Sequence, residues 1–158
     1  MSNRSCRLRS KAALAGVLLA ALGCESPTDV LVADLQGTWL ASQVRILDIE
    51  LPKEFNFDLV ELGYSAIFSS PGDGDFTLRL DPPEGEAQYI VGTLETDGTS
   101  VVVRTATTTG SGEVFLEGEQ VALSLTAGLT YDFAGKGEEK PAKLLLVMDR
   151  QSPDPTPL

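Results

Sequence analysis

Short runs of alternating apolar and polar residues occupy the middle of the chain. In residues 76–80 every second side chain is apolar, and the same period recurs in residues 121–126 and 129–133. A period of two with one apolar face is typical of half-buried antiparallel strands. The hydrophobic pattern therefore predicts an all-β domain.

Clusters of glycine and proline separate these runs. Gly supplies positive φ and Pro fixes φ, so such clusters end strands rather than continue them. Many short strands joined by tight turns form a meander, and a meander of this length closes most economically as a barrel. The predicted fold is an antiparallel meander that closes as an eight- to nine-stranded barrel. Its strands are expected at residues 38–48, 64–69, 76–80, 87–96, 100–107, 113–117, 120–126, 129–134 and 142–149.

Residues 52–62 break the alternation. Phe55, Leu59 and Leu62 recur there at helical spacing. This spacing predicts either a short helix or a packed loop that covers one end of the barrel, and the sequence leaves both alternatives open.

The beginning of the chain has the composition of a bacterial export signal. Residues 1–11 carry four basic side chains and no acidic one, and residues 12–22 form an apolar run. This run of 11 residues is about half of the roughly 20 needed to cross a bilayer as a helix. We therefore predict a cleaved signal peptide over residues 1–23.

Cys24 follows the small residues that precede the predicted cut. Residues 21–24, with the sequence ALGC, resemble the lipobox of bacterial lipoproteins, in which this Cys is acylated and begins the mature chain. The resemblance implies a cell-envelope protein anchored to the lipid bilayer through Cys24. Glu25 follows in place of the Asp that retains some lipoproteins at the inner membrane, so the outer membrane is favoured. Ala21 stands where the family prefers Leu, and ordinary signal cleavage with a free Cys24 thiol is the alternative.

Removal of the signal leaves a strongly acidic protein. The remaining 135 residues hold 8 basic and 23 acidic side chains, a net charge of −15. Such a surface repels phosphate backbones and anionic headgroups, which argues against nucleic-acid binding and charge-driven membrane docking. We expect a tether at residues 24–34, the barrel domain at 35–150 and, because of its three prolines, a disordered tail at 151–158.

The composition removes most catalytic and metal chemistries. The chain has no His, which excludes imidazole-based triads and His-ligated metal sites. Paired acids at residues 84–86 and 138–139 fall in predicted turns, where carboxylates are normally solvated. Residues 132–139 offer oxygen ligands around glycines, but Ala134 and Lys136 occupy alternate positions of that loop. We therefore predict a protein that is not an enzyme and that holds no metal and no cofactor.

The head of the first predicted strand carries a family signature. Residues 35–39, LQGTW, resemble the Gly-x-Trp motif that opens lipocalin and calycin barrels. The acidic Gly turn at 73–78 and the late hairpin at 131–144 are similar to those of small lipocalin-like lipoproteins of bacteria. The resemblance implies that Trp39 closes the barrel floor and that Gly37 lets the chain approach it closely. Two further marks of the family are not evident, among them the Arg that packs on the Trp from near the end of the barrel, for which Arg150 is the candidate by position.

A lipocalin-like barrel implies a lumen, and aromatic residues on the strands are candidates for its lining. In a small barrel such side chains more often fill the interior than enclose a roomy pocket, so a packed or narrow interior is favoured. The candidates are Tyr64, Phe68, Tyr89, Tyr131 and Phe133.

The sequence is compatible with two functions. One is a monomeric binding module for a small apolar ligand. The other is a solid-core interaction or inhibitor module whose loops contact another cell-envelope protein. The volume of the lumen distinguishes the two functions, since a site for a drug-sized ligand needs about 300 Å³ or more.

Overall fold

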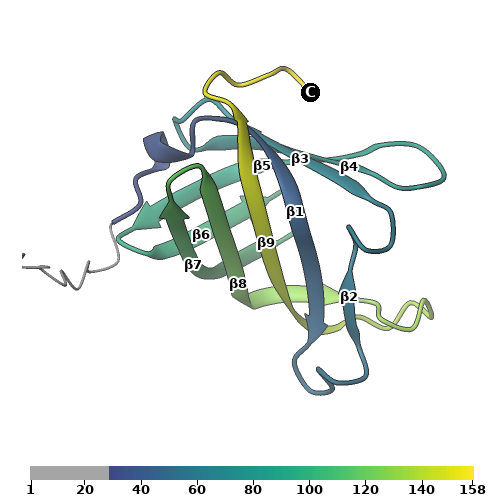
Figure 1. Cartoon of the computed structure of the whole chain (residues 1–158). Helices are drawn as coiled ribbons and strands as arrows, with labels where there is room; N and C mark the ends of the chain where they lie inside the picture. The colour runs from purple at the N-terminus through teal and green to yellow at the C-terminus, as the bar shows by residue number, and fades with distance from the viewer. Residues whose placement is uncertain (1–28) are drawn as a thin grey trace, which may run out of the picture.

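Nine antiparallel strands and one short 3₁₀ helix make up residues 29–158, the part of the chain that this computed structural model describes (Figure 1). The strands follow one another as neighbours from β3 to β9, and β1 pairs with both β3 and β9. Eight strands therefore close into a barrel, with β2 as an added ninth, which confirms the predicted all-β barrel. The elements are η1 (Val32–Leu35), β1 (Gly37–Asp48), β2 (Asn56–Asp58), β3 (Ser65–Ser70), β4 (Asp75–Asp81), β5 (Gln88–Asp97), β6 (Ser100–Thr105), β7 (Thr109–Glu117), β8 (Gln120–Tyr131) and β9 (Lys140–Ser152).

Residues 52–62 form β2 with turns on either side, so the helix, one of the two alternatives left open by the sequence, is wrong. The buried Asp58 carboxylate accepts hydrogen bonds from the backbone N–H groups of Val44 (3.3 Å) and Val60 (3.1 Å). The Leu59 N–H group donates to the Val44 carbonyl oxygen at 2.8 Å. The two bonds to Val44 and the pairing of β2 with β1 tie the segment to β1, because extended backbone can pair with a strand edge and a helix cannot.

The two strands expected at 120–126 and 129–134 are one bent strand, β8. Its pairing with β9 shifts register between Leu125 and Leu129 and then continues to Tyr131. Gly128, at φ +81°, lies in this bulge, where a Cβ atom would overlap the Thr109 carbonyl oxygen. The glycine therefore bends a continuous strand instead of ending it.

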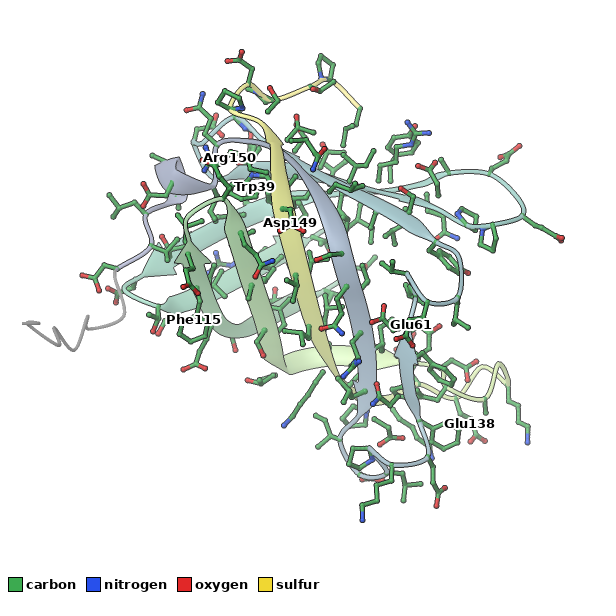
Figure 2. All side chains as sticks on the ribbon, viewed as in Figure 1. Trp39, Glu61, Phe115, Glu138, Asp149 and Arg150 are labelled. Atoms are coloured by element: carbon green, nitrogen blue, oxygen red, sulfur yellow. The ribbon has the colours of Figure 1, made fainter. Side chains whose placement is uncertain are left out.

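Trp39 closes one end of the barrel, hereafter the closed end. Its side chain is 0% exposed, and its indole N–H donates to the Leu35 carbonyl oxygen in η1 at 3.0 Å. Arg150, its register partner on β9, places Cζ 4.4 Å from the centroid of the indole ring, and the two lie together in Figure 2. Gly37, at φ +129°, stands where a Cβ atom would overlap the Ser152 carbonyl oxygen, so the chain passes β9 closely.

The dry core fills the half of the barrel next to Trp39. Val30 enters it from the N-terminal side, 2% exposed, and its N–H group donates to the Gly98 carbonyl oxygen at 3.0 Å. The buried side chains that share this half stand near the closed-end termini of their strands. They include Val101, Val114, Val121 and Met148.

The end of the chain is hydrogen-bonded to the closed end, in contrast to the predicted disorder of residues 151–158. β9 continues to Ser152, and the Thr156 N–H group donates to Thr38 Oγ1 at 2.8 Å. The Ser69 hydroxyl donates to the Thr156 carbonyl oxygen at 3.0 Å. Hydroxyls at the ends of β1 and β3 thus supply partners that the composition of the tail does not reveal.

The predicted signal peptide and Cys24 lie outside the described residues, as does most of the predicted tether. Within residues 29–158, no helix is both long enough and apolar enough to cross a membrane.

Truncation of Trp39 tests the closed end. We expect Trp39→Ala to lower the free energy of unfolding by about 3–5 kcal/mol, because it removes a large buried side chain and leaves a cavity. Phe115→Ala is the matched control, since Phe115 is 43% exposed on β7 and should cost less than about 1 kcal/mol. Urea denaturation followed by circular dichroism measures both variants. Equal losses in the two variants would contradict the buried position of Trp39.

Candidate ligand-binding cavity

A cavity of about 270 Å³ lies inside the barrel and extends from Phe68, the register partner of Trp39, toward the end opposite Trp39. Leucines from β8 and β9 form one wall, and their cross-strand pairs are Leu123 with Leu146 and Leu125 with Leu144. These residues face inward together because directly paired residues in neighbouring strands share a face and the period is two.

Phe68 on β3 and Phe76 on β4 form the opposite wall. Their ring centroids lie 5.5 Å apart with an interplanar angle of 18°, so the two rings are stacked. Leu78 and Val103 extend the lining along β4 and β6. The described lining residues are aliphatic, aromatic, Gly or Thr, and none of them is charged.

The mouth of the cavity lies between the start of β5 and the turn that joins β6 to β7. β5 pairs with β6 from Gly92 onward, so the residues before Gly92 pair with β4 alone among the described strands. Ile90 from this unpaired stretch lines the cavity and is 37% exposed. Thr107 and Thr108 line it from the other side. We call this opening, between Ile90 and Thr107–Thr108, the mouth.

A hydroxyl-capped turn holds the two mouth threonines in place. The Thr105 N–H group donates to the Thr108 carbonyl oxygen at 2.8 Å, and Thr105 Oγ1 accepts from the Thr108 N–H group at 3.1 Å. The Thr105 hydroxyl is thereby committed to the turn. The hydroxyls of Thr107 and Thr108 have no hydrogen-bond partner within residues 29–158, and both residues line the cavity at the mouth.

Acidic residues dominate the loops at the mouth end of the barrel. The loops at residues 49–55, 82–87, 106–108 and 132–139 hold seven acidic and two basic side chains. Figure 2 shows one of them, Glu138, at the end of the molecule opposite Trp39. The mouth therefore lies in a region of negative potential.

Four aromatic rings pack beside the cavity, and we call Phe55, Phe57, Tyr131 and Phe133 the aromatic cluster. The Phe133 ring centroid lies 5.0 Å from that of Tyr131, 5.7 Å from that of Phe55 and 6.1 Å from that of Phe57. Leu129 lines the cavity, and Tyr131 follows it on the same face of β8. The cluster joins the β8–β9 hairpin to the segment around β2 next to the cavity.

The loop at 132–139 uses its first carboxylate to close the hairpin. Asp132 Oδ2 accepts a hydrogen bond from the Gly137 N–H group at 2.6 Å, and Oδ1 accepts one from Ala134 at 3.2 Å. The Gly137 hydrogen bond is the main reason that the pKa of Asp132 lies below its usual value. Both oxygens of Asp132 therefore stabilise the turn.

Of the five aromatic residues predicted to line a lumen, Phe68 lies in the lining. Tyr89 is 52% exposed on the outer face of β5, because the alternation of that strand turns Ile90 inward instead. Tyr64 lies just before β3 outside the lining, and Tyr131 and Phe133 belong to the aromatic cluster.

The lining residues that were not among the predicted set are mostly aliphatic. They stand at alternate positions of the strands, as in Phe76 and Leu78 or Leu123 and Leu125. The two-residue period of the strands could have identified these lining residues, whereas aromatic character could not.

No family model, curated protein or solved structure matches this chain.

Proposed function

We propose that this chain is a non-catalytic, lipid-anchored binding protein that holds a small apolar ligand inside a lipocalin-like barrel. The observation that carries the proposal is the uncharged, mostly aliphatic cavity that opens at the end of the barrel away from Trp39. Apolar cavities lack atoms for their lining to contact, so an apolar ligand that fills one gains both contacts and burial.

The size of the cavity selects a slender ligand. Its volume of about 270 Å³ lies just below the lower end of drug-sized sites, about 300 Å³. The interior is thus narrow rather than roomy. Its described lining contains no carboxylate, amine or thiol that could act as acid, base or nucleophile, which supports a binding role.

The closed end supports the lipocalin-like assignment. In that family the signature Trp is covered by an Arg from near the end of the barrel. Here the Arg150 guanidinium lies over the buried Trp39 ring, an arrangement in which the cation also gains from the negative face of the indole.

The point at which the chain enters the barrel determines how the barrel of an anchored protein would be oriented relative to the membrane. Val30 is buried at the closed end, and Cys24 lies six residues before it. Six residues reach at most about 20 Å, which is shorter than β1, whose 12 residues span roughly 40 Å. With acylated Cys24 in the outer membrane, the closed end would lie next to the bilayer. The mouth would then face away from it and exchange ligand with the aqueous phase.

A free strand edge favours a second candidate function, contact with another cell-envelope protein. The Leu94 N–H group donates toward the β4 side, to the Gly74 carbonyl oxygen at 2.7 Å. Alternation along β5 then directs the backbone groups of Tyr89 and Val91 to the other side, where no described strand pairs with them. Their side chains are also exposed, so this edge can accept an extended peptide. Such a contact would use a strand edge rather than the loops.

Filling the cavity tests the ligand-binding proposal. Val103 lines the cavity, and we expect Val103→Trp to weaken binding of the neutral apolar probe toluene about tenfold or more. Val102→Trp is the matched control, because Val102 is the neighbouring residue on the opposite face of β6. Ligand-observed NMR titration measures both variants after circular dichroism has verified their fold. Unchanged binding by Val103→Trp would place the probe outside the cavity.

Substitution of Cys24 tests the anchor. The full chain expressed in a Gram-negative host should partition into the detergent phase of Triton X-114 and carry the added mass of acyl chains. Cys24→Ser should move to the aqueous phase, because acyl chains supply the membrane affinity. Subcellular fractionation and intact mass spectrometry measure the result. A Cys24→Ser protein that stays membrane-bound would contradict the assignment of Cys24 as the lipid anchor.

A further inference from the structure

We infer that the ligand of the cavity is a single unbranched aliphatic chain with an uncharged, hydrogen-bonding head, held at the mouth by the hydroxyls of Thr107 and Thr108. The inference rests on the proposed ligand-binding function and names the chemical class of the ligand. A medium-chain alcohol is the simplest member of this class.

The volume and lining of the cavity determine the apolar part of the ligand. At roughly 30 Å³ for each water-sized group, a space of about 270 Å³ holds about nine such groups. This corresponds to a chain of about eight to ten carbon atoms. The stacked rings of Phe68 and Phe76 face the leucines of β8 and β9 across a narrow interior. A fused skeleton of three or more rings holds more carbon atoms than this space admits.

The mouth threonines determine the kind of head. Thr105 Oγ1 already accepts from the Thr108 N–H group and donates to the Thr108 carbonyl oxygen, so the Thr105 hydroxyl is occupied. The hydroxyls of Thr107 and Thr108 have no partner within the described residues. A hydroxyl can both donate and accept a hydrogen bond. Two such groups at the end of an apolar cavity therefore suit an alcohol, ester or amide head.

The charges around the mouth argue against an anionic head. The lining offers no cation, and the loops at 49–55, 82–87, 106–108 and 132–139 hold seven acidic and two basic side chains. Arg79 and Arg104, on the strands next to the mouth, are already paired with Asp81 at 2.8 Å and Glu95 at 2.6 Å. A carboxylate at the mouth would lose hydration without gaining a counter-ion.

A cationic head also lacks a partner within the cavity. The acidic side chains that make the potential negative lie in the loops, and none of them lines the cavity. An ammonium group at the threonines would find hydroxyl acceptors but no carboxylate to neutralise it. The uncharged head is therefore favoured over both ionic heads.

The experiment compares three ligands that share one chain. Decan-1-ol, decanoate and decylamine are titrated into the full chain at pH 7.5, and displacement of the probe toluene, followed by its NMR signal, reports binding. We expect decan-1-ol to bind about tenfold more tightly than either ionic ligand. In the double variant Thr107→Val with Thr108→Val, the affinity for decan-1-ol should fall about tenfold, because two hydrogen bonds are lost.

A matched double variant controls for general effects of removing hydroxyls. Thr77→Val with Thr93→Val changes two threonines on the outer face of β4 and β5, away from the lining, and should leave all three affinities unchanged. Tight binding of decanoate or decylamine at the level of decan-1-ol would overturn the uncharged head while leaving the ligand-binding proposal in place. Failure of all three ligands to displace the probe would overturn the proposed function itself.

Discussion

Pairing between the first and last strands is the constraint on which the remaining structure depends. β1 pairs with β9 from Thr38 opposite Ser152 to Asp48 opposite Ala142. This pairing converts a meander, in which each strand contacts its neighbours in sequence, into a closed barrel with few free edges. It also brings Arg150 onto Trp39, although 111 positions separate them in the chain. Closure and the covered Trp39 are thus two results of one register.

The wall of the barrel is complete near Trp39 but interrupted between β5 and β6 at the other end, and this asymmetry produces the candidate site. Near Trp39 the interior is filled by buried side chains such as Val101 and Val114. Toward the other end β5 continues to Gln88 while β6 ends at Thr105, so the wall between them is interrupted where Ile90 and the mouth threonines meet. Figure 1 shows the β4–β5 hairpin extending beyond the barrel on this side. A cavity with an entrance follows from unequal strand lengths, without any specialised loop.

The sequence alone revealed the features that depend on local patterns. Alternation predicted an antiparallel barrel of eight to nine strands, although it missed β2 and divided β8 in two, and residues 37–39 resembled the signature whose Trp closes one end of a barrel. Features that depend on distant partners were not accessible. A glycine such as Gly128 is expected equally in a turn and in a bulge, and the pairing of the residues around it with β7 and β9 decides between the two.

Distant partners also explain why the segment around β2 and the tail at residues 151–158 differ from the predictions. Asp58 reaches Val44 across 14 positions, and Thr156 reaches Thr38 across 118. For the candidate site, aromatic character led to Tyr89, whereas the strand turns Ile90 inward. Alternate residues of a strand point to opposite faces of the sheet. The register with the neighbouring strand decides which of the two alternating sets points into the barrel.

Methyl NMR of the protein with bound decan-1-ol tests the central claim, that the barrel is filled at one end and binds a ligand at the other. The account predicts intermolecular contacts from the alkyl chain to the methyl groups of Leu123, Leu125 and Leu144, which line the cavity. It predicts none to Val30 and Val114, which are buried near the closed end. Contacts confined to exposed residues such as Val91, or contacts that reach Val114, would contradict it.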